Sequence, residues 1–316
     1  MQLRKIGASD LLVSAVGLGC NNFGVRCDLA QSRAVVEQAI ASGITLFDTA
    51  DTYGNRGGSE EFLGRILGSR RRDVVIATKF GSPMDDAGLL KGASTRYVMT
   101  AVEASLTRLN TDWIDLYQLH RPDATTPIEE TLRALDDLVR QGKVRYIGAS
   151  NFTAAEVLAA DRAARTHGLH RFTSMQNEYS LLTRGVEREL LPALASCDLG
   201  LLPYFPLASG LLTGKYSPVH VPEGSRLATP RPHERAFIAG ANWPAISRLE
   251  HFARSREHSL LDLALGWLLA QPTVASVIAG ATRPEQVAQN VAAAHWHLSA
   301  EDAAEAGRLA SGDAAA

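Results

Sequence analysis

Eight short apolar segments, separated by longer segments with helical patterning, constrain the fold of this chain more than any other feature. Several are apolar throughout rather than alternating, which is typical of parallel strands buried on both faces. Most are followed by a helical pattern, and eight βα units favour a closed (β/α)8 TIM barrel over an open doubly wound sheet. The predicted strands are residues 15–18, 44–47, 74–77, 114–118, 144–147, 173–176, 199–203 and 274–279.

Two further segments precede the first barrel strand and predict an N-terminal β-hairpin. Residues 3–6 and 11–13 flank the turn-forming sequence Gly7-Ala8-Ser9-Asp10. We expect this hairpin to cap the barrel and to close its bottom.

Three threonines, each followed three residues later by a glutamate, predict where helices begin. Thr126 with Glu129, Thr153 with Glu156, and Thr282 with Glu285 have the spacing of a capping box. In the first of these helices, apolar residues recur at helical spacing up to Val139, and Gly142 is expected to end the helix.

The composition is that of an ordinary globular protein. The 316 residues are enough for one large core and predict a single domain over residues 1–316. A hydrophobic content of 46% and a net charge of -2 give no sign of binding to nucleic acid or to an anionic membrane. No signal segment follows Met1, and no apolar stretch is long enough to span a membrane. The three cysteines lack metal-ligand spacing, so we expect a cytoplasmic protein without a metal.

Polar side chains directly follow several of the predicted strands. Asp48 follows the second strand, Lys79 the third and His120 the fourth, and Tyr53 lies shortly after Asp48. In (β/α)8 barrels the carboxyl ends of the strands meet at one rim, which carries the active site. We therefore expect these four side chains to lie close together.

This set of residues suits delivery of a proton to a carbonyl oxygen. A tyrosine phenol, with a pKa of about 10, is a weak acid at neutral pH. A nearby ammonium such as that of Lys79 lowers this pKa, Asp48 holds the lysine, and His120 orients the carbonyl or shares the proton. Taken by themselves, Asp48 and Lys79 are equally consistent with a buried structural ion pair.

Seven sequence motifs lie at or beyond the ends of the predicted strands. They are FDTADTYG (47–54), ATK (77–79), DLYQLH (115–120), GASNF (148–152), QNEY (176–179), GLLTGKY (210–216) and GATRPEQ (280–286). In this order and at this spacing they resemble the motifs of the aldo-keto reductase family, from about residue 2 to residue 298. Each motif is moderately specific, and together they are highly specific.

The resemblance implies a role for each matching residue. Tyr53 would be the general acid of a tetrad completed by Asp48, Lys79 and His120. Family members often have Thr-Trp after the first strand, where this chain has Cys20-Asn21, and this affects the expected shape of the substrate pocket. The implied cofactor-binding residues are Asp48; Ser150, Asn151 and Gln176 at the nicotinamide carboxamide; Tyr204 on the nicotinamide ring; Phe205, Pro206, Leu207, Ser209, Gly210 and Lys215 at the pyrophosphate; and Arg226, Gly280, Thr282, Arg283, Gln286, Gln289 and Asn290 at the adenosine end.

These matches predict NADPH-dependent reduction of aldehydes or ketones, with NADH as a second option. Arg226 and Arg283 are expected near the 2′-phosphate, because an arginine at a helix N-terminus suits a phosphate. The reaction is reversible, so a sugar or alcohol dehydrogenase is an alternative.

Two other functions stay open at this point. One is a cofactor-binding subunit of an ion channel, although that branch commonly has Asn where this chain has His120. The other is a barrel aldolase with Lys79 as a Schiff base. The substrate, a small carbonyl compound or alcohol, depends on loops around 21–26, 80–91, 121–125 and 212–235, and the oligomeric state is not readable.

Overall fold

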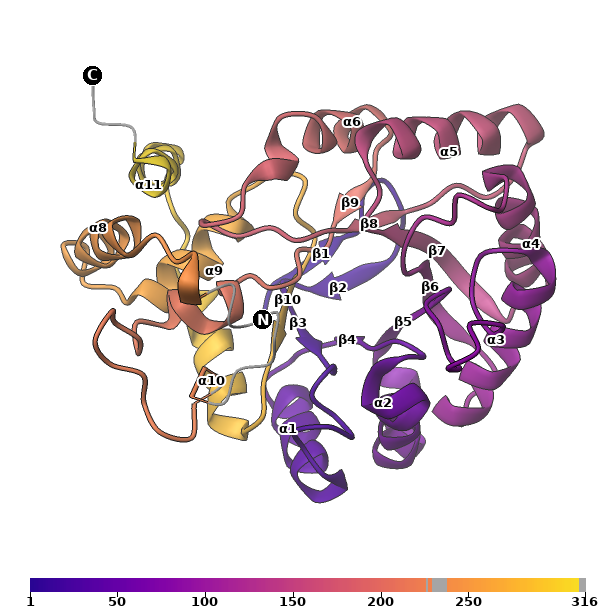
Figure 1. Cartoon of the computed structure of the whole chain (residues 1–316), viewed down its shortest axis with the longest axis horizontal. Helices are drawn as coiled ribbons and strands as arrows, with labels where there is room; N and C mark the ends of the chain where they lie inside the picture. Colours follow the sequence, from indigo (N-terminus) through magenta and orange to yellow (C-terminus); the bar gives the residue numbers. More distant parts are fainter. Residues whose placement is uncertain (226, 229–237, 313–316) are drawn as a thin grey trace.

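Eight parallel strands form the barrel in the computed structural model, which describes residues 1–225, 227–228 and 238–312. Their order is β10-β3-β4-β5-β6-β7-β8-β9. The barrel closes beside β9, where the Leu201 N–H donates to the Thr273 carbonyl at 2.7 Å and the Ala275 N–H donates to the Leu201 carbonyl at 2.9 Å. The predicted (β/α)8 barrel is thus confirmed (Figure 1). The strands are β3 (Val16–Gly19), β4 (Leu46–Asp48), β5 (Val75–Phe80), β6 (Ile114–Leu119), β7 (Val144–Ser150), β8 (Ser174–Gln176), β9 (Gly200–Leu201) and β10 (Val277–Gly280).

Each of the eight predicted segments overlaps one barrel strand, with shifted ends. The apolar segments extend beyond the hydrogen-bonded part of the strand because the flanking residues are also buried. Ile44 is buried before β4 begins, and Leu202 is buried after β9 ends. Burial, rather than strand pairing, therefore sets the length of each apolar segment.

Helices surround the barrel on its outside (Figure 1). The pair α8 and α11 pack against each other, and α8 also packs against α9. No helix within the described ranges is both long and apolar enough to cross a membrane. The helices are α1 (Leu29–Ala41), α2 (Tyr53–Leu67), α3 (Thr95–Leu109), α4 (Ile128–Arg140), α5 (Ala154–His167), α6 (Leu190–Ser196), α8 (Trp243–Arg254), α9 (Leu260–Leu269), α10 (Pro284–Ala293) and α11 (Ala300–Ser311), with the 3-10 helices η1 (Gly68–Asp73), η2 (Gly185–Glu187) and η3 (Ala208–Thr213).

The predicted N-terminal hairpin is present and caps the barrel. Strands β1 (Leu3–Lys5) and β2 (Leu12–Ser14) pair in antiparallel fashion. The turn between them needs a glycine, because Gly7 has a φ of 55° and a Cβ there would lie 2.3 Å from the Asp198 carbonyl oxygen. The hairpin buries Ile6, Leu11 and Val13 in one apolar cluster with residues from the barrel interior, namely Leu46, Ala77, Leu116, Leu202, Ala275 and Ile278. The hairpin therefore closes the end of the barrel opposite the rim at which the strands end.

One of the first two predicted capping boxes is confirmed and the other is wrong. The Thr153 hydroxyl accepts the Glu156 N–H, and the Glu156 carboxylate accepts the Thr153 N–H. Thr126 instead donates its hydroxyl to the Asp123 carboxylate at 2.8 Å, and α4 begins one residue later, after Pro127. The hydroxyl that would have capped the helix is used to fold the loop before it.

Candidate active site

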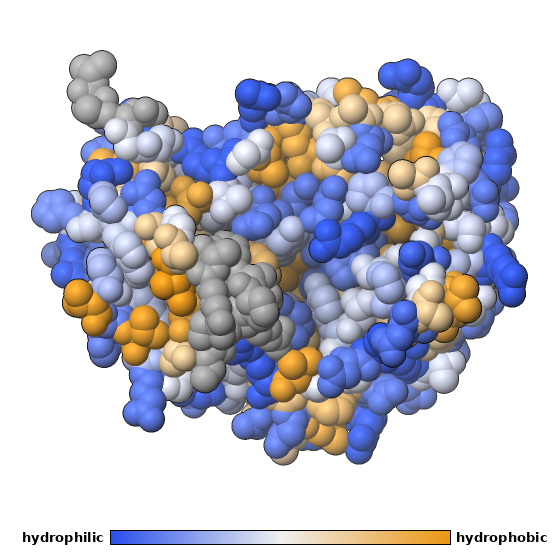
Figure 2. Space-filling model, viewed as in Figure 1, coloured by the Kyte–Doolittle hydropathy of each residue, from blue (hydrophilic) through white to orange (hydrophobic). Residues whose placement is uncertain are grey.

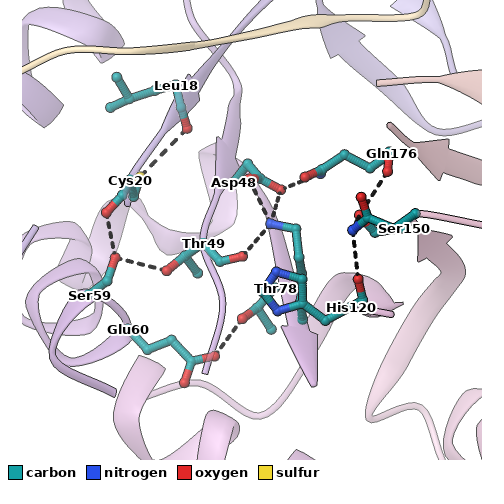
Figure 3. Close-up of polar contacts among 12 residues, drawn as sticks. Leu18, Cys20, Asp48, Thr49, Ser59, Glu60, Thr78, His120, Ser150 and Gln176 are labelled. Atoms are coloured by element: carbon teal, nitrogen blue, oxygen red, sulfur yellow. Dashed lines mark hydrogen bonds and ion pairs between the residues drawn. The ribbon is translucent and has the colours of Figure 1, made fainter. Parts of the chain in front are cut away.

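The centre of the rim is an ion pair between Lys79 and Asp48. Lys79 of β5 is 0% exposed, and its Nζ lies 2.9 and 2.8 Å from the two carboxylate oxygens of Asp48 at the end of β4 (Figure 3). Nζ also donates to the Thr49 carbonyl at 2.8 Å. Burial by itself would lower the pKa of Lys79, but the charges and hydrogen bonds of Asp48 and Tyr53 outweigh it and raise that pKa. The ammonium is therefore charged at neutral pH.

Tyr53 lies next to this ion pair at the start of α2. The Lys79 Nζ is 5.0 Å from the centroid of the Tyr53 ring, and the His120 ring packs edge-on at a centroid distance of 5.9 Å. Burial raises the pKa of Tyr53, and the opposing effect of Lys79 does not cancel it. The expectation of a lowered pKa is thus wrong for the net shift, because desolvation exceeds the attraction of the ammonium. The phenol carries its proton at neutral pH and can donate it.

A left-handed turn directly follows Tyr53 and sets its position. Residues Gly54, Asn55, Arg56 and Gly57 all have positive φ, at 71°, 60°, 71° and 118°. A Cβ at Gly54 would lie 2.4 Å from the Ser59 nitrogen, so only glycine fits there. Consecutive left-handed residues are costly for L-amino acids, and here they form a kink inside α2, between Tyr53 and the rest of the helix. The sequence analysis did not predict this turn, although two glycines and an asparagine within four residues are a signal for one.

His120 lies at the end of β6 as a neutral imidazole. Burial and the nearby charges of Lys79 and Arg121 lower its pKa to about 3. Its Nδ1 is buried and has no hydrogen-bond partner among the described residues. Its carbonyl accepts the Asn151 amide at 3.0 Å, which ties the end of β6 to the end of β7. A neutral ring can orient a carbonyl group without competing with Tyr53 as an acid.

The residues expected around a nicotinamide form one hydrogen-bonded group beside the tetrad. Gln176 donates its side-chain amide to Asp48 Oδ1 at 2.8 Å, and Ser150 donates its hydroxyl to the Gln176 carbonyl at 2.7 Å (Figure 3). The Tyr204 hydroxyl donates to Asn151 Oδ1 at 2.8 Å, and Asn151 has a φ of 64°. The ends of β7 and β8 and the chain after β9 are thus joined to Asp48, and their amides and rings suit a nicotinamide and its carboxamide.

The segment expected at the pyrophosphate is a tight loop that includes η3. Phe205, Ala208, Ser209 and Gly210 have positive φ, and the Ser209 hydroxyl is buried without a partner within the described residues. Leu207, after Pro206, accepts the Gly210 N–H at 2.8 Å. A buried hydroxyl in a loop with several left-handed residues makes a cradle that suits a phosphate group. The exposed Lys215 follows, with its Nζ 5.0 Å from the centroid of the Tyr216 ring.

The residues expected at the adenosine end gather at the start of α10. The predicted capping box of Thr282 with Glu285 is wrong, because Thr282 donates its N–H and hydroxyl to Gln286 Oε1 at 2.8 and 3.2 Å. The longer glutamine side chain reaches back over the turn, and Arg283 is the N-cap, without a side-chain hydrogen bond to the helix. Gly280 ends β10, Gln289 is exposed on α10, Asn290 is buried there, and Arg226 lies outside the described residues.

Sequence reasoning missed a buried charged cluster behind Tyr53. Asp51 is 1% exposed, and neither of its carboxyl oxygens has a hydrogen-bond partner among the described residues. Burial and the charge of Glu60 raise the pKa of Asp51 to about 8. Glu60 is also buried, accepting the Thr78 hydroxyl at 2.5 Å and the Arg108 Nε at 2.7 Å. Arg108 thus pairs with Glu60 and acts on Asp51 only through its charge, and the Asp51 carboxyl holds a proton at neutral pH.

Comparisons with known proteins agree with this geometry. The sequence profile of the "Aldo/keto reductase family" matches residues 15–310. A "Probable voltage-gated potassium channel subunit beta" of Oryza sativa subsp. japonica is 36% identical over 303 residues, which cover 93% of this chain and 91% of that protein. "L-glyceraldehyde 3-phosphate reductase" of Escherichia coli (strain K12) is 35% identical, over 93% of this chain and 87% of that protein. "Versiconal hemiacetal acetate reductase" of Aspergillus parasiticus is 33% identical, over 96% and 95%.

The chain belongs to the aldo/keto reductase family. It is accordingly an oxidoreductase, and the reductases among its relatives point to carbonyl reduction in general.

Proposed function

We propose that this protein reduces aldehydes or ketones to alcohols with NADPH, and that Tyr53 is the general acid. The observation that carries the proposal is the protonated Tyr53 phenol, placed between the charged Lys79 and the neutral His120. When bound, the nicotinamide cofactor supplies a hydride to the carbonyl carbon.

In the proposed mechanism, the Tyr53 hydroxyl donates its proton to the carbonyl oxygen as negative charge develops there. The Lys79 ammonium stabilises the resulting tyrosinate, and Asp48 keeps that ammonium in place with two short contacts. His120 orients the carbonyl oxygen toward Tyr53. Proton release in the reverse direction uses the same groups, so a dehydrogenase reaction needs no other residue.

The cofactor residues are proposed from the donors and acceptors that the rim presents. Ser150, Asn151 and Gln176 would hold the carboxamide, with the Tyr204 ring against the nicotinamide. A preference for NADPH over NADH would come from Arg283 and Arg226, because the first turn of α10 has no side-chain cap that competes with a phosphate. The exposed Glu285 does not close that turn.

Two other functions are weaker. An aldolase needs an uncharged Lys79 amine, whereas Asp48 and the Thr49 carbonyl accept hydrogen bonds from its charged ammonium. A regulatory channel subunit is supported by the name of a relative at 36% identity. The complete set of Tyr53, Lys79 and His120 at the rim favours an enzyme over that role.

The test is a panel of aldehydes, ketones and alcohols, each with NADPH, NADH and their oxidised forms. We expect NADPH oxidation with several aldehydes, and a loss of at least about 10²-fold in Tyr53→Phe. Tyr146→Phe, a tyrosine of β7 outside the site, is the matched control. Tight NADPH binding without turnover on any substrate would favour the regulatory role instead.

A further inference from the structure

Arg121 is the first residue after His120, and it brings a positive charge to the rim of the barrel. Its side chain is exposed, and within the described part of the chain no ion pair or hydrogen bond engages its guanidinium. Figure 2 shows a hollow over the barrel axis whose border on the side of β6, β7 and β8 is largely hydrophilic. An exposed arginine directly after His120, without such a protein partner, is available to a ligand.

The charge of Arg121 acts on both sides of the site. Burial, then the charge of Lys79 and then that of Arg121 lower the pKa of the neighbouring His120. The Arg121 charge also opposes the effects of burial and of Glu178, which raise the pKa of Tyr204. Tyr204 follows β9, and β7 and β8 lie between β9 and β6 in the barrel. The charge of Arg121 is therefore close enough to the rim to act on both His120 and Tyr204.

The carboxylates near Arg121 are engaged elsewhere. Asp123 accepts the Ala93 N–H at 2.8 Å and the hydroxyls of Thr125 and Thr126 at 2.6 and 2.8 Å. These hydrogen bonds outweigh its partial burial and lower its pKa to about 2, so Asp123 folds the loop that carries Arg121. Glu178 accepts the Thr183 hydroxyl at 3.4 Å. The loop is thus ordered, and neither carboxylate forms an ion pair with Arg121 within the described part of the chain.

We propose that Arg121 is a specificity-determining residue that binds an anionic group, a carboxylate or a phosphate, on the carbonyl substrate. The inference rests on the proposed reductase function and names the class of substrate for the same site. A guanidinium presents a planar fork of donors that matches the paired oxygens of a carboxylate or phosphate. Its position beside His120 would hold the far end of a short substrate while the carbonyl end reaches Tyr53.

Two matched pairs of aldehydes test the proposal: 4-oxobutanoate against butanal, and glyceraldehyde 3-phosphate against glyceraldehyde. The readout is the ratio of kcat/KM for the anionic member to that for its neutral partner. We expect this ratio to exceed one in the wild type and to fall about tenfold in Arg121→Gln, mainly through KM, on the scale of one exposed hydrogen bond to a charged group. Arg121→Lys should recover part of the loss, and added salt should lower the wild-type ratio. The pair with the larger ratio shows whether carboxylate or phosphate is the preferred group.

Arg133→Gln is the matched control, because Arg133 is an exposed arginine of α4 outside the site. It should leave both ratios as in the wild type. Ratios that Arg121→Gln leaves unchanged, or wild-type ratios at or below one for both pairs, would overturn the proposal.

A binding measurement separates this inference from the proposed function. Calorimetric titration with succinate and with inorganic phosphate is carried out on the protein saturated with the nicotinamide cofactor it binds. Weaker binding of either anion to Arg121→Gln, but not to Arg133→Gln, would support the anion site even if the wild type reduced none of the aldehydes. Equal binding of both anions to the wild type and to Arg121→Gln would refute the site whatever the turnover.

Discussion

Asp51→Asn tests the protonated carboxyl behind Tyr53 through the pH dependence of stability. Asparagine has nearly the shape of a protonated aspartate and cannot ionise. Asp51 is 1% exposed and has a pKa of about 8, against 3.8 for an ordinary aspartate. Between these two values the folded state holds a proton that the unfolded state has released.

The sign and size of the effect follow from this proton. Stability falls with rising pH wherever the folded state binds more protons than the unfolded state, by about 1.4 kcal/mol per pH unit for one proton. From pH 5 to pH 7, Asp51 therefore costs the wild type about 2.7 kcal/mol of unfolding free energy relative to Asp51→Asn. The loss continues up to the folded-state pKa of about 8 and then stops.

The assay is urea unfolding of both proteins at half-unit steps of pH from 5 to 9, with the exposed Asp112→Asn as a control for removal of one negative charge. Subtracting the two curves cancels every other titrating group. A difference between Asp51→Asn and wild type that stays constant within about 0.5 kcal/mol would show that the Asp51 carboxyl is ionised in the folded protein. If instead only the difference between Glu60→Gln and wild type grows with pH, the carboxyl that holds the proton is that of Glu60.

Three further predictions concern the proposed site. Tyr53→Phe should reduce carbonyl turnover at least about 10²-fold and leave cofactor binding within a few-fold; a variant that keeps half of the wild-type rate would remove Tyr53 as the acid. Lys79→Met should abolish turnover and cost about 3–5 kcal/mol of unfolding free energy, because it leaves Asp48 as an unpaired buried carboxylate; an unchanged melting temperature with normal activity contradicts both roles. Arg283→Ala should lower kcat/KM with NADPH by an amount equivalent to about 1.5–3 kcal/mol and should hardly change kcat/KM with NADH. Equal losses with both cofactors would mean that Arg283 only shapes the turn.

The barrel and the group around Lys79 were predictable because they depend on simple patterns. Buried parallel strands are apolar throughout, and polar residues just beyond them, such as Asp48 and His120, must share a rim. Strand order then brings these residues together without any knowledge of side-chain conformation.

Features that depend on packing between helices were not predictable. Glu60 on α2 and Arg108 on α3 meet only because these two helices pack side by side, so their sequence positions carry no sign of the cluster around Asp51. The net pKa shift of Tyr53 needed the degree of burial as well as the neighbouring charge. The predicted capping boxes at Thr126 and Thr282 are wrong for two reasons. The Thr126 hydroxyl donates to Asp123 instead, and the Thr282 hydroxyl donates to the side chain of Gln286 rather than pairing with Glu285.

The hairpin at the N-terminus has a consequence for the order of folding. It precedes every barrel strand in the sequence, yet its binding surface is assembled from residues as distant as Leu46, Leu116 and Ile278. Arg4 adds hydrogen bonds to the carbonyls of Leu269 and Val274, close to the last barrel strand. Contacts at such sequence separation form slowly. The hairpin therefore docks only once strands from the whole length of the barrel are in place, and its docking marks the completion of the barrel.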